Sequence, residues 1–125
     1  MVVLDGDGSL LMNLGSLVTI ADQAPRNLWH FVCHNGMYEV NGRYPTPGGR
    51  RVDFAAIARA AGIGRVYSFD DLGRFEAELG TVLTGEGPVF VNLVVHEGEP
   101  YPRDYDRIHG KAEREAFRRA LRARL

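Results

Sequence analysis

The chain has 125 residues, of which 45% are hydrophobic, and its net charge of −1 gives no general attraction to nucleic acid. That length fits one globular domain with a sizeable core and leaves little room for a second. A single cysteine excludes an internal disulfide, and no apolar stretch approaches the roughly 20 residues that span a bilayer, so we expect a cytoplasmic protein with no membrane partner.

The first half of the chain alternates apolar runs with helical patterns. Residues 2–4 are a short apolar run ended by glycines, which predicts a buried strand. Apolar residues over 10–21 follow helical spacing on more than one stripe, so we expect a helix that is buried nearly all round. A second strand is predicted at 28–33. The Gly- and Pro-rich segment 34–51 after it is too long for a plain connector.

The second half continues the alternation. Asp53 can cap one helix, and either Asp70 or Asp71 can cap another. Strands are predicted at 65–69 and 88–95, and the latter is apolar almost without alternation, as in a central parallel strand. Strands separated by helices predict an α/β fold, with a parallel sheet and helices on both faces.

The C-terminal segment 101–125 is predicted to hold a charged helix that begins near residue 111. Ala116, Phe117 and Leu121 fall on one side of this helix, and arginines dominate the other side. We expect the apolar side to pack on the domain formed by residues 1–100.

The sequence DGDGS, residues 5–9, lies where the first predicted strand meets the first predicted helix. Two aspartates in this spacing occur in calcium loops, in aspartyl-phosphate phosphatases, and in sites that anchor a diphosphate through magnesium. A calcium loop of the EF-hand type needs a glycine at its sixth position and an acidic ligand at its twelfth. Those positions hold Leu10 and Ser16, which excludes the calcium loop.

The phosphatase interpretation rests on a resemblance of VVLDGDGSL to the first motif of the haloacid dehalogenase family. There Asp5 would be the nucleophile and Asp7 the acid, and a cation would hold the transferred phosphoryl group. The only lysine, Lys111, comes after the carboxylates of residues 68–72, which is the wrong order for that family. The phosphatase stays a distant alternative.

The diphosphate interpretation uses the local geometry best. Gly6 and Gly8 let the backbone approach a phosphate closely, and Ser9 lies where the first N–H groups of a helix can donate to an anion. Asp7 is then placed to hold a hard cation such as Mg²⁺, which commonly keeps phosphate oxygens in its shell. A second ligand is expected at the carboxyl end of a neighbouring strand, and Asn35 lies there, with 26 residues between Gly8 and Asn35.

This GDGS pattern followed by Asn is similar to the thiamine diphosphate motif of 2-oxoacid decarboxylases and acetolactate synthases. Over about residues 2–95 the chain most resembles the cofactor-binding domain of phosphonopyruvate and sulfopyruvate decarboxylases. The resemblance implies a thiamine diphosphate-binding, Rossmann-like domain that acts on a small anionic 2-oxoacid. The usual motif has a pair of asparagines, and His34 replaces the first of them.

The resemblance also implies roles for individual residues. Asp7, Asn35 and the carbonyl oxygen of Met37 would bind Mg²⁺. Gly6, Gly8, Ser9, Asn35, Met37 and Tyr38 would contact thiamine diphosphate. His34 could donate to the substrate or serve as a polar loop residue, and Arg50 and Arg51 could meet a phosphonate or sulfonate or be solvated.

Relatives of this kind keep the glutamate that activates the cofactor on a separate, pyrimidine-binding domain, so no catalytic residue is expected in this chain. We therefore expect a hetero-oligomer with a pyrimidine-binding α subunit. Relatives also carry a strand and a helix before the GDG strand, which suggests an N-terminally truncated chain. An acetolactate synthase-like enzyme and an inactive fragment of another thiamine diphosphate enzyme stay open as alternatives.

Overall fold

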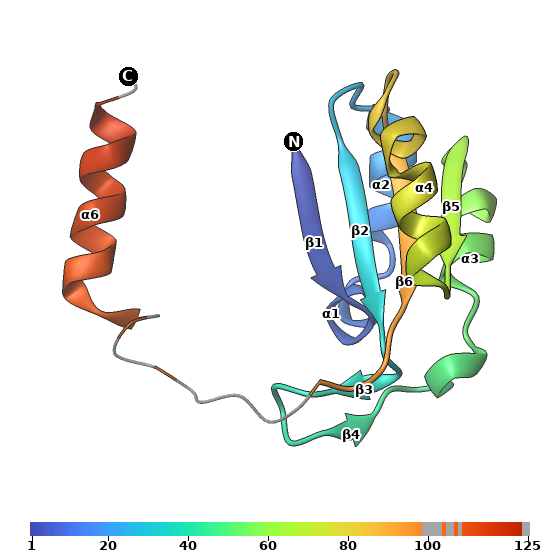
Figure 1. Ribbon diagram of the computed structural model, residues 1–125, viewed down its shortest axis with the longest axis horizontal. Helices are drawn as coiled ribbons and strands as arrows, with labels where there is room; N and C mark the ends of the chain where they lie inside the picture. The colour runs from blue at the N-terminus through green and yellow to red at the C-terminus, as the bar shows by residue number, and fades with distance from the viewer. Residues whose placement is uncertain (99–103, 105–106, 108, 124–125) are drawn as a thin grey trace.

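The computed structural model describes residues 1–98, 104, 107 and 109–123. A parallel sheet of four strands forms its centre, in the order β1-β2-β6-β5 (Figure 1). The strands are β1 (Val2–Gly6), β2 (Trp29–His34), β5 (Arg65–Phe69) and β6 (Val89–Val94). The predicted parallel α/β fold is confirmed, and the nearly unbroken apolar run at 88–95 supplies an interior strand, as expected.

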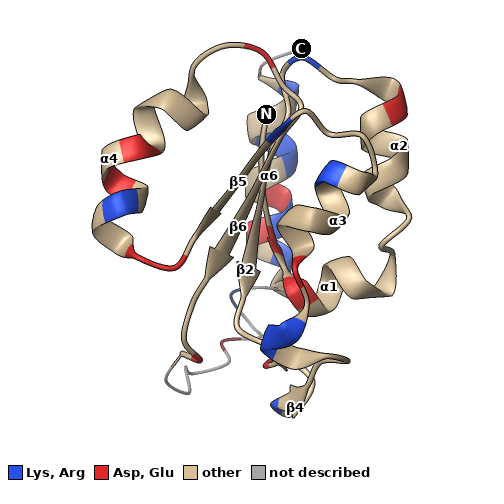
Figure 2. Cartoon of the chain, turned by 90° about the vertical axis from the view of Figure 1, so that its right-hand side faces the viewer, with Lys and Arg blue, Asp and Glu red and all other residues tan. Residues whose placement is uncertain are grey.

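Helices cover both faces of this sheet (Figure 2). On one face lie α1 (Asp7–Met12), α2 (Ser16–Gln23) and α3 (Phe54–Ala60), and on the other lies α4 (Leu72–Leu83). Each face has its own apolar core. The first core contains Leu10, Leu17, Val32, Phe54 and Phe90, and the second contains Phe31, Phe69, Val82, Val89 and Val91.

The predicted helix caps are present. The Asp53 carboxylate accepts a hydrogen bond from the N–H of Ala56 at the start of α3, at 2.8 Å. The Asp71 carboxylate accepts one from the N–H of Arg74 at the start of α4, also at 2.8 Å. Asp71 rather than Asp70 is therefore the cap of α4.

The prediction of one long, nearly fully buried first helix was wrong. The helical backbone begins at Asp7, breaks at Asn13, and resumes in α2. Both pieces lie on one face of the sheet, so only the inward side chains are buried. Met12 and Val18 point outward and are 70% and 60% exposed.

The first strand also differs from the prediction of a buried strand. β1 is an edge strand, and Val2 and Leu4 are 58% and 76% exposed. These two residues face the side of the sheet on which α4 covers β6 and β5 rather than β1 (Figure 1). The sequence shows that residues 2–4 are apolar. It does not show that α4 leaves this edge of the sheet uncovered.

The Gly- and Pro-rich segment between β2 and α3 forms an antiparallel hairpin and a helical turn. Its elements are β3 (Met37–Tyr38), β4 (Tyr44–Pro45) and the 3₁₀ turn η1 (Gly49–Arg51). This segment lies beyond the carboxyl ends of the parallel strands (Figure 1). That position is where open α/β sheets bind ligands.

The C-terminal helix α6 (Lys111–Arg122) forms as predicted, but it has no buried residue. Phe117 and Leu121, on its apolar side, are 66% and 47% exposed. The expected packing of this side on the rest of the domain is therefore not seen among the described residues. Neither α6 nor any other helix in the described ranges is long and apolar enough to cross a membrane.

Candidate functional site

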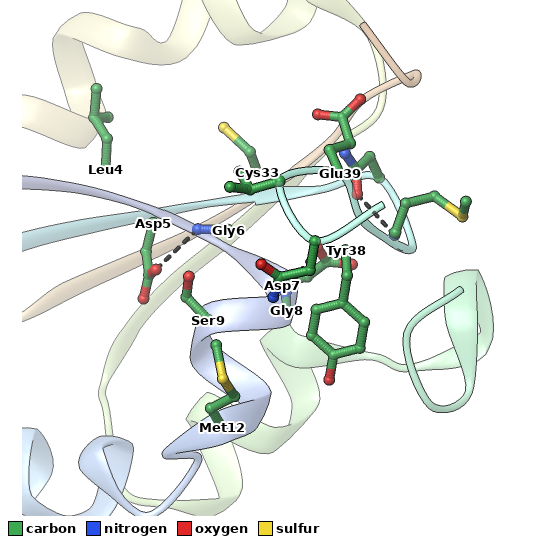
Figure 3. Close-up of a pocket in the computed structure, with 14 residues that line it drawn as sticks. Leu4, Asp5, Gly6, Asp7, Gly8, Ser9, Met12, Cys33, Tyr38 and Glu39 are labelled. Atoms are coloured by element: carbon green, nitrogen blue, oxygen red, sulfur yellow. Dashed lines mark hydrogen bonds between the residues drawn. The ribbon is translucent and has the colours of Figure 1, made fainter. Parts of the chain in front are cut away.

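A pocket of about 300 Å³ lies where the carboxyl ends of β1 and β2 meet the β3-β4 hairpin (Figure 3). Every residue predicted from the sequence to contact Mg²⁺ or thiamine diphosphate lines it, whereas His34, Arg50 and Arg51 do not. Those that line it are Gly6, Asp7, Gly8, Ser9, Asn35, Met37 and Tyr38. The structure therefore brings together two segments, 5–9 and 35–38, that are separated by a helical connection in the sequence. Their roles toward a ligand stay predictions.

Asp7 is the centre of this arrangement. Its side chain is only 2% exposed, and its Oδ1 accepts a hydrogen bond from the N–H of Gly8 at 2.9 Å. Its Oδ2 accepts one from the N–H of Gly36 at 2.8 Å, which joins the end of β1 to the turn after β2. Among the described residues no cationic side chain forms an ion pair with Asp7. A buried carboxylate without a counter-ion is costly, so a bound cation would stabilise it.

Asn35 directly follows β2 and directly precedes Gly36, whose N–H donates to Asp7. Its Oδ1 accepts a hydrogen bond from the N–H of Met37 at 2.8 Å, which fixes the side-chain amide in the turn. Carboxylate, amide and carbonyl oxygens are hard ligands that suit Mg²⁺. The described residues contain no cluster of three or more His, Cys, Asp or Glu side chains that could hold a metal by themselves. Mg²⁺ here would need further oxygens from a bound phosphate or from water.

The Tyr38 ring lies so close to the backbone of Gly8 that a side chain at position 8 would collide with it. A Cβ atom at position 8 would lie 2.5 Å from Cδ1 and 2.7 Å from Cε1 of the Tyr38 ring, well inside van der Waals contact. Figure 3 shows this ring beside Gly8, at the side of the pocket. At Gly6 a Cβ atom would meet nothing within 4 Å. The two glycines of the motif therefore differ: one allows an aromatic side chain to pack, and the other keeps the pocket open.

Ser9 is exposed and lines the pocket in the first turn of α1. This helix has only six residues, so its dipole is small. What the segment offers an anion is chiefly the N–H groups of its first turn, which have no carbonyl partner within the helix. One of them, the N–H of Gly8, already donates to Oδ1 of Asp7.

Asp5 has a different role from Asp7. Its Oδ2 lies 3.3 Å from Nε2 of the buried His30, and its Oδ1 accepts a hydrogen bond from the N–H of Gly6 at 2.9 Å. His30 faces the helices on the α1 side and packs edge-on against Phe90 with ring centroids 5.5 Å apart. Asp5 is thus part of a structural pair at the base of the pocket.

Cys33 borders the same pocket from β2. Burial raises the pKa of its thiol, and the carboxylates of Asp7 and Asp5 raise that pKa further by disfavouring a second negative charge. The thiol is therefore neutral at physiological pH. A neutral thiol is a poor nucleophile and a poor metal ligand, so Cys33 contributes a small uncharged wall.

His34 does not line this pocket. It is 2% exposed, its ring packs edge-on against Phe54 with centroids 4.9 Å apart, and its Nε2 lies 3.2 Å from the carbonyl oxygen of Gly49. The hypothesis that it contacts a substrate here is therefore not supported. Sequence reasoning missed the apolar rim of the pocket, formed by Leu4, Met12 and Val40, because exposed apolar residues carry no motif.

Comparison with known proteins places this chain in a family. Residues 1–93 match the family model for "Thiamine pyrophosphate enzyme, C-terminal TPP binding domain". The chain is 41% identical over 97 residues to a phosphonopyruvate decarboxylase of Streptomyces viridochromogenes, covering 78% of this chain and 24% of the relative. It is 42% identical over 97 residues to a sulfopyruvate decarboxylase subunit beta of Methanothermobacter thermautotrophicus, covering 78% and 49%.

Comparison of the fold with solved structures agrees with this family. A solved structure from Mycobacterium smegmatis, assigned to the thiamin diphosphate-dependent enzymes, superposes with a TM-score of 0.59 at 28% identity. The match covers 78% of this chain and 18% of that chain. The chain thus spans between about a quarter and a half of the length of these two curated relatives.

Proposed function

The chain belongs to the thiamine pyrophosphate enzymes and carries their C-terminal TPP-binding domain, and from this we propose that it is the thiamine diphosphate- and Mg²⁺-binding component of a 2-oxoacid decarboxylase. Its similarity to phosphonopyruvate and sulfopyruvate decarboxylases supports a small anionic 2-oxoacid as substrate. The family match contradicts the haloacid dehalogenase-type phosphatase.

One observation carries the proposal. The hydrogen bond from the N–H of Gly36 to Oδ2 of Asp7 holds a buried carboxylate beside the turn that contains Asn35 and Met37. All the oxygen ligands expected for Mg²⁺ therefore lie at one edge of the sheet, next to the backbone of Gly8 and Ser9 that would contact the diphosphate. A divalent ion there would offset both the Asp7 charge and the charge of the diphosphate.

In this proposal the chain positions the cofactor and the cofactor supplies the reaction chemistry. The thiazolium ring of thiamine diphosphate acts as the electron sink when a 2-oxoacid loses CO2. Asp7 and Asn35 hold the metal, Gly8 and Ser9 contact the diphosphate, and Tyr38 shields one side of it. No residue of this chain is assigned a proton-transfer step.

The exposed apolar side chains at the rim of the pocket support the proposal of a partner subunit. Leu4 and Met12, which line the pocket, are 76% and 70% exposed, and apolar side chains in this position suit burial against another protein surface. A relative named as a subunit beta has the same domain. We propose a pyrimidine-binding α subunit as partner, which would supply the cofactor-activating glutamate and complete a hetero-oligomer.

The test is calorimetric titration of Mg²⁺ and thiamine diphosphate into the purified chain together with its candidate partner. Asp7→Asn is expected to weaken Mg²⁺-dependent binding at least about tenfold, or about 1.4 kcal/mol, because it removes the negative charge that would face the metal. Asn35→Leu is expected to weaken it by at least as much, because it removes a ligand oxygen.

Asp5→Asn is the matched control. Asp5 is two residues from Asp7 and lines the same pocket, but it pairs with His30, so its variant should bind the cofactor within about threefold of the unchanged chain. Undiminished metal-dependent binding in the Asp7 and Asn35 variants would refute the proposed ligand set. Decarboxylation of a 2-oxoacid by the assembled complex then tests the reaction itself.

A further inference from the structure

A second polar cavity lies next to the cofactor pocket. His34 and Asn35 are consecutive, yet Asn35 lines the cofactor pocket and His34 lines this other cavity of about 420 Å³. Its walls come from η1, α3 and the ends of β5 and β6, on the helix-rich side of the sheet (Figure 2). Its polar side chains are His34, Arg50, Arg51, Asp53, Arg59, Ser68 and Asn92.

Two buried atoms in this wall have no hydrogen-bond partner among the described residues. They are Nδ1 of His34, in a residue 2% exposed, and Oδ1 of Asn92, in a residue 4% exposed. Nε2 of His34 faces the carbonyl oxygen of Gly49 and must donate to it, which leaves Nδ1 as an acceptor in the neutral ring. Nδ2 of Asn92 donates to Oγ of Ser68 at 3.1 Å, which leaves Oδ1 as an acceptor. Two residues of the cavity lining therefore each hold a buried acceptor that has no donor among the described residues.

The opening of the same cavity is cationic. Arg51 and Arg59 are exposed, and neither guanidinium group forms a hydrogen bond or ion pair with another described residue. Arg50 is held by a hydrogen bond from its guanidinium to the carbonyl oxygen of Val95 at 2.8 Å. The only carboxylate, Asp53, already accepts the N–H of Ala56 as the cap of α3. Three arginines against one aspartate leave a net positive charge.

We propose that this cavity binds a phosphorus oxyanion that keeps one acidic hydroxyl, such as hydrogen phosphate or a phosphonate monoanion. The charged oxygens pair with the guanidinium groups of Arg51 and Arg59, which match such oxyanions in charge and geometry. The P–OH group donates to Nδ1 of His34 or Oδ1 of Asn92. Sulfate and sulfonates carry no proton near neutral pH, so they would leave both buried acceptors unpaired.

This site does not depend on the proposed function. It shares no lining residue with the cofactor pocket, and its predicted ligand binds without thiamine diphosphate or Mg²⁺. A failure of cofactor binding therefore leaves this inference standing, and a failure of anion binding leaves the cofactor site standing.

The test is calorimetric titration of the full chain with inorganic phosphate, methylphosphonate and sulfate at constant ionic strength, in the absence of Mg²⁺ and cofactor. Phosphate and methylphosphonate are expected to bind at least about tenfold more tightly than sulfate. The double variant Arg51→Ala/Arg59→Ala should lose at least about tenfold in phosphate affinity, and both substitutions are at exposed positions that should not disturb folding.

The matched control is Arg118→Ala/Arg122→Ala, which removes two exposed arginines from α6 and should leave phosphate binding unchanged. Asn92→Leu tests the buried acceptor: it should remove the preference for phosphate over sulfate. Absence of phosphate binding would overturn the proposal, as would equal affinity for sulfate. An equal loss in the α6 control would also overturn it, because that loss would indicate general attraction of anions to arginine.

Discussion

At the residue scale, the two aspartates of one short motif do different work. Asp5 and Asp7 are separated by a single glycine, and both lie at the end of β1. Asp5 pairs with the buried His30, whereas Asp7 accepts two backbone N–H groups, one of them from the turn after β2. Asp7, which binds the turn after β2 through the N–H of Gly36, is the carboxylate expected to bind metal. Asp5, which pairs with His30 of β2, supports the sheet.

The glycines of the motif give a prediction about stability. Gly8→Ala should lower the free energy of unfolding by about 1–2 kcal/mol, because its new Cβ atom collides with the Tyr38 ring and the cost of overpacking exceeds the gain in helix propensity. Gly6→Ala is the control: nothing lies within 4 Å, and its φ of −101° suits alanine. Urea unfolding of both variants measures the difference.

A double variant separates the collision from other causes. In a Tyr38→Ala background the ring is gone, so Gly8→Ala should carry no further penalty. If Gly8→Ala is as stable as Gly6→Ala in the unchanged background, the close approach of Tyr38 does not constrain position 8.

At the element scale, capping residues and glycines determine where helices begin, and the sheet determines which of their sides are buried. α3 and α4 begin after aspartates that accept N–H groups of the first turn, as their sequences predict. α1 and α2 have equally apolar sequences, but they lie on one face of the sheet and bury only one side each. The starts of α3 and α4 were therefore readable from local sequence, whereas the break between α1 and α2 and the burial of these two helices were not.

The cap of α4 gives a prediction at this scale. Asp71→Ala should lower the free energy of unfolding by about 1 kcal/mol, because the N–H of Arg74 loses its side-chain acceptor. Asp70→Ala is the matched control, since Asp70 is adjacent, exposed and not the cap, and it should change stability by less than about 0.5 kcal/mol. Chemical unfolding compares the two. Equal losses would mean that negative charge near the helix start matters rather than the cap.

At the scale of the whole molecule, the exposed apolar side chains of the described residues include two groups that bear on assembly. Val2 and Leu4 on the edge strand β1 are exposed, and so is the apolar side of α6. The first lies beside the cofactor pocket and fits the proposed partner subunit. For the second, packing on the same domain was predicted from the sequence, and it is not present among the described residues.

Two leucine substitutions test whether α6 contributes to the folded core. Leu17→Ala removes a side chain that is 1% exposed and should cost about 2–5 kcal/mol of unfolding free energy. Leu121→Ala removes one that is 47% exposed and should cost less than about 0.5 kcal/mol. Thermal or urea unfolding provides the comparison. A loss above about 1 kcal/mol for Leu121→Ala would show that α6 is buried in solution, on this domain or between copies.

The sequence by itself determined the four strands of the parallel sheet, the starts of α3 and α4, the parallel α/β class and the polar and glycine residues of the proposed cofactor pocket. These features depend on local periodicity, capping and motif spacing, all of which act over a few residues. Asp7 and Asn35 could be expected at one place because the carboxyl ends of adjacent parallel strands always share an edge.

Only the tertiary structure decided which surfaces are covered and where each side chain points. β1 has the composition of an interior strand, yet it lies at the edge, because strand order depends on contacts between distant segments. His34 and Asn35 are neighbours in sequence but line different cavities, since successive side chains at a strand end point to opposite sides. The second cavity, built from four separate segments, has no counterpart in any local pattern.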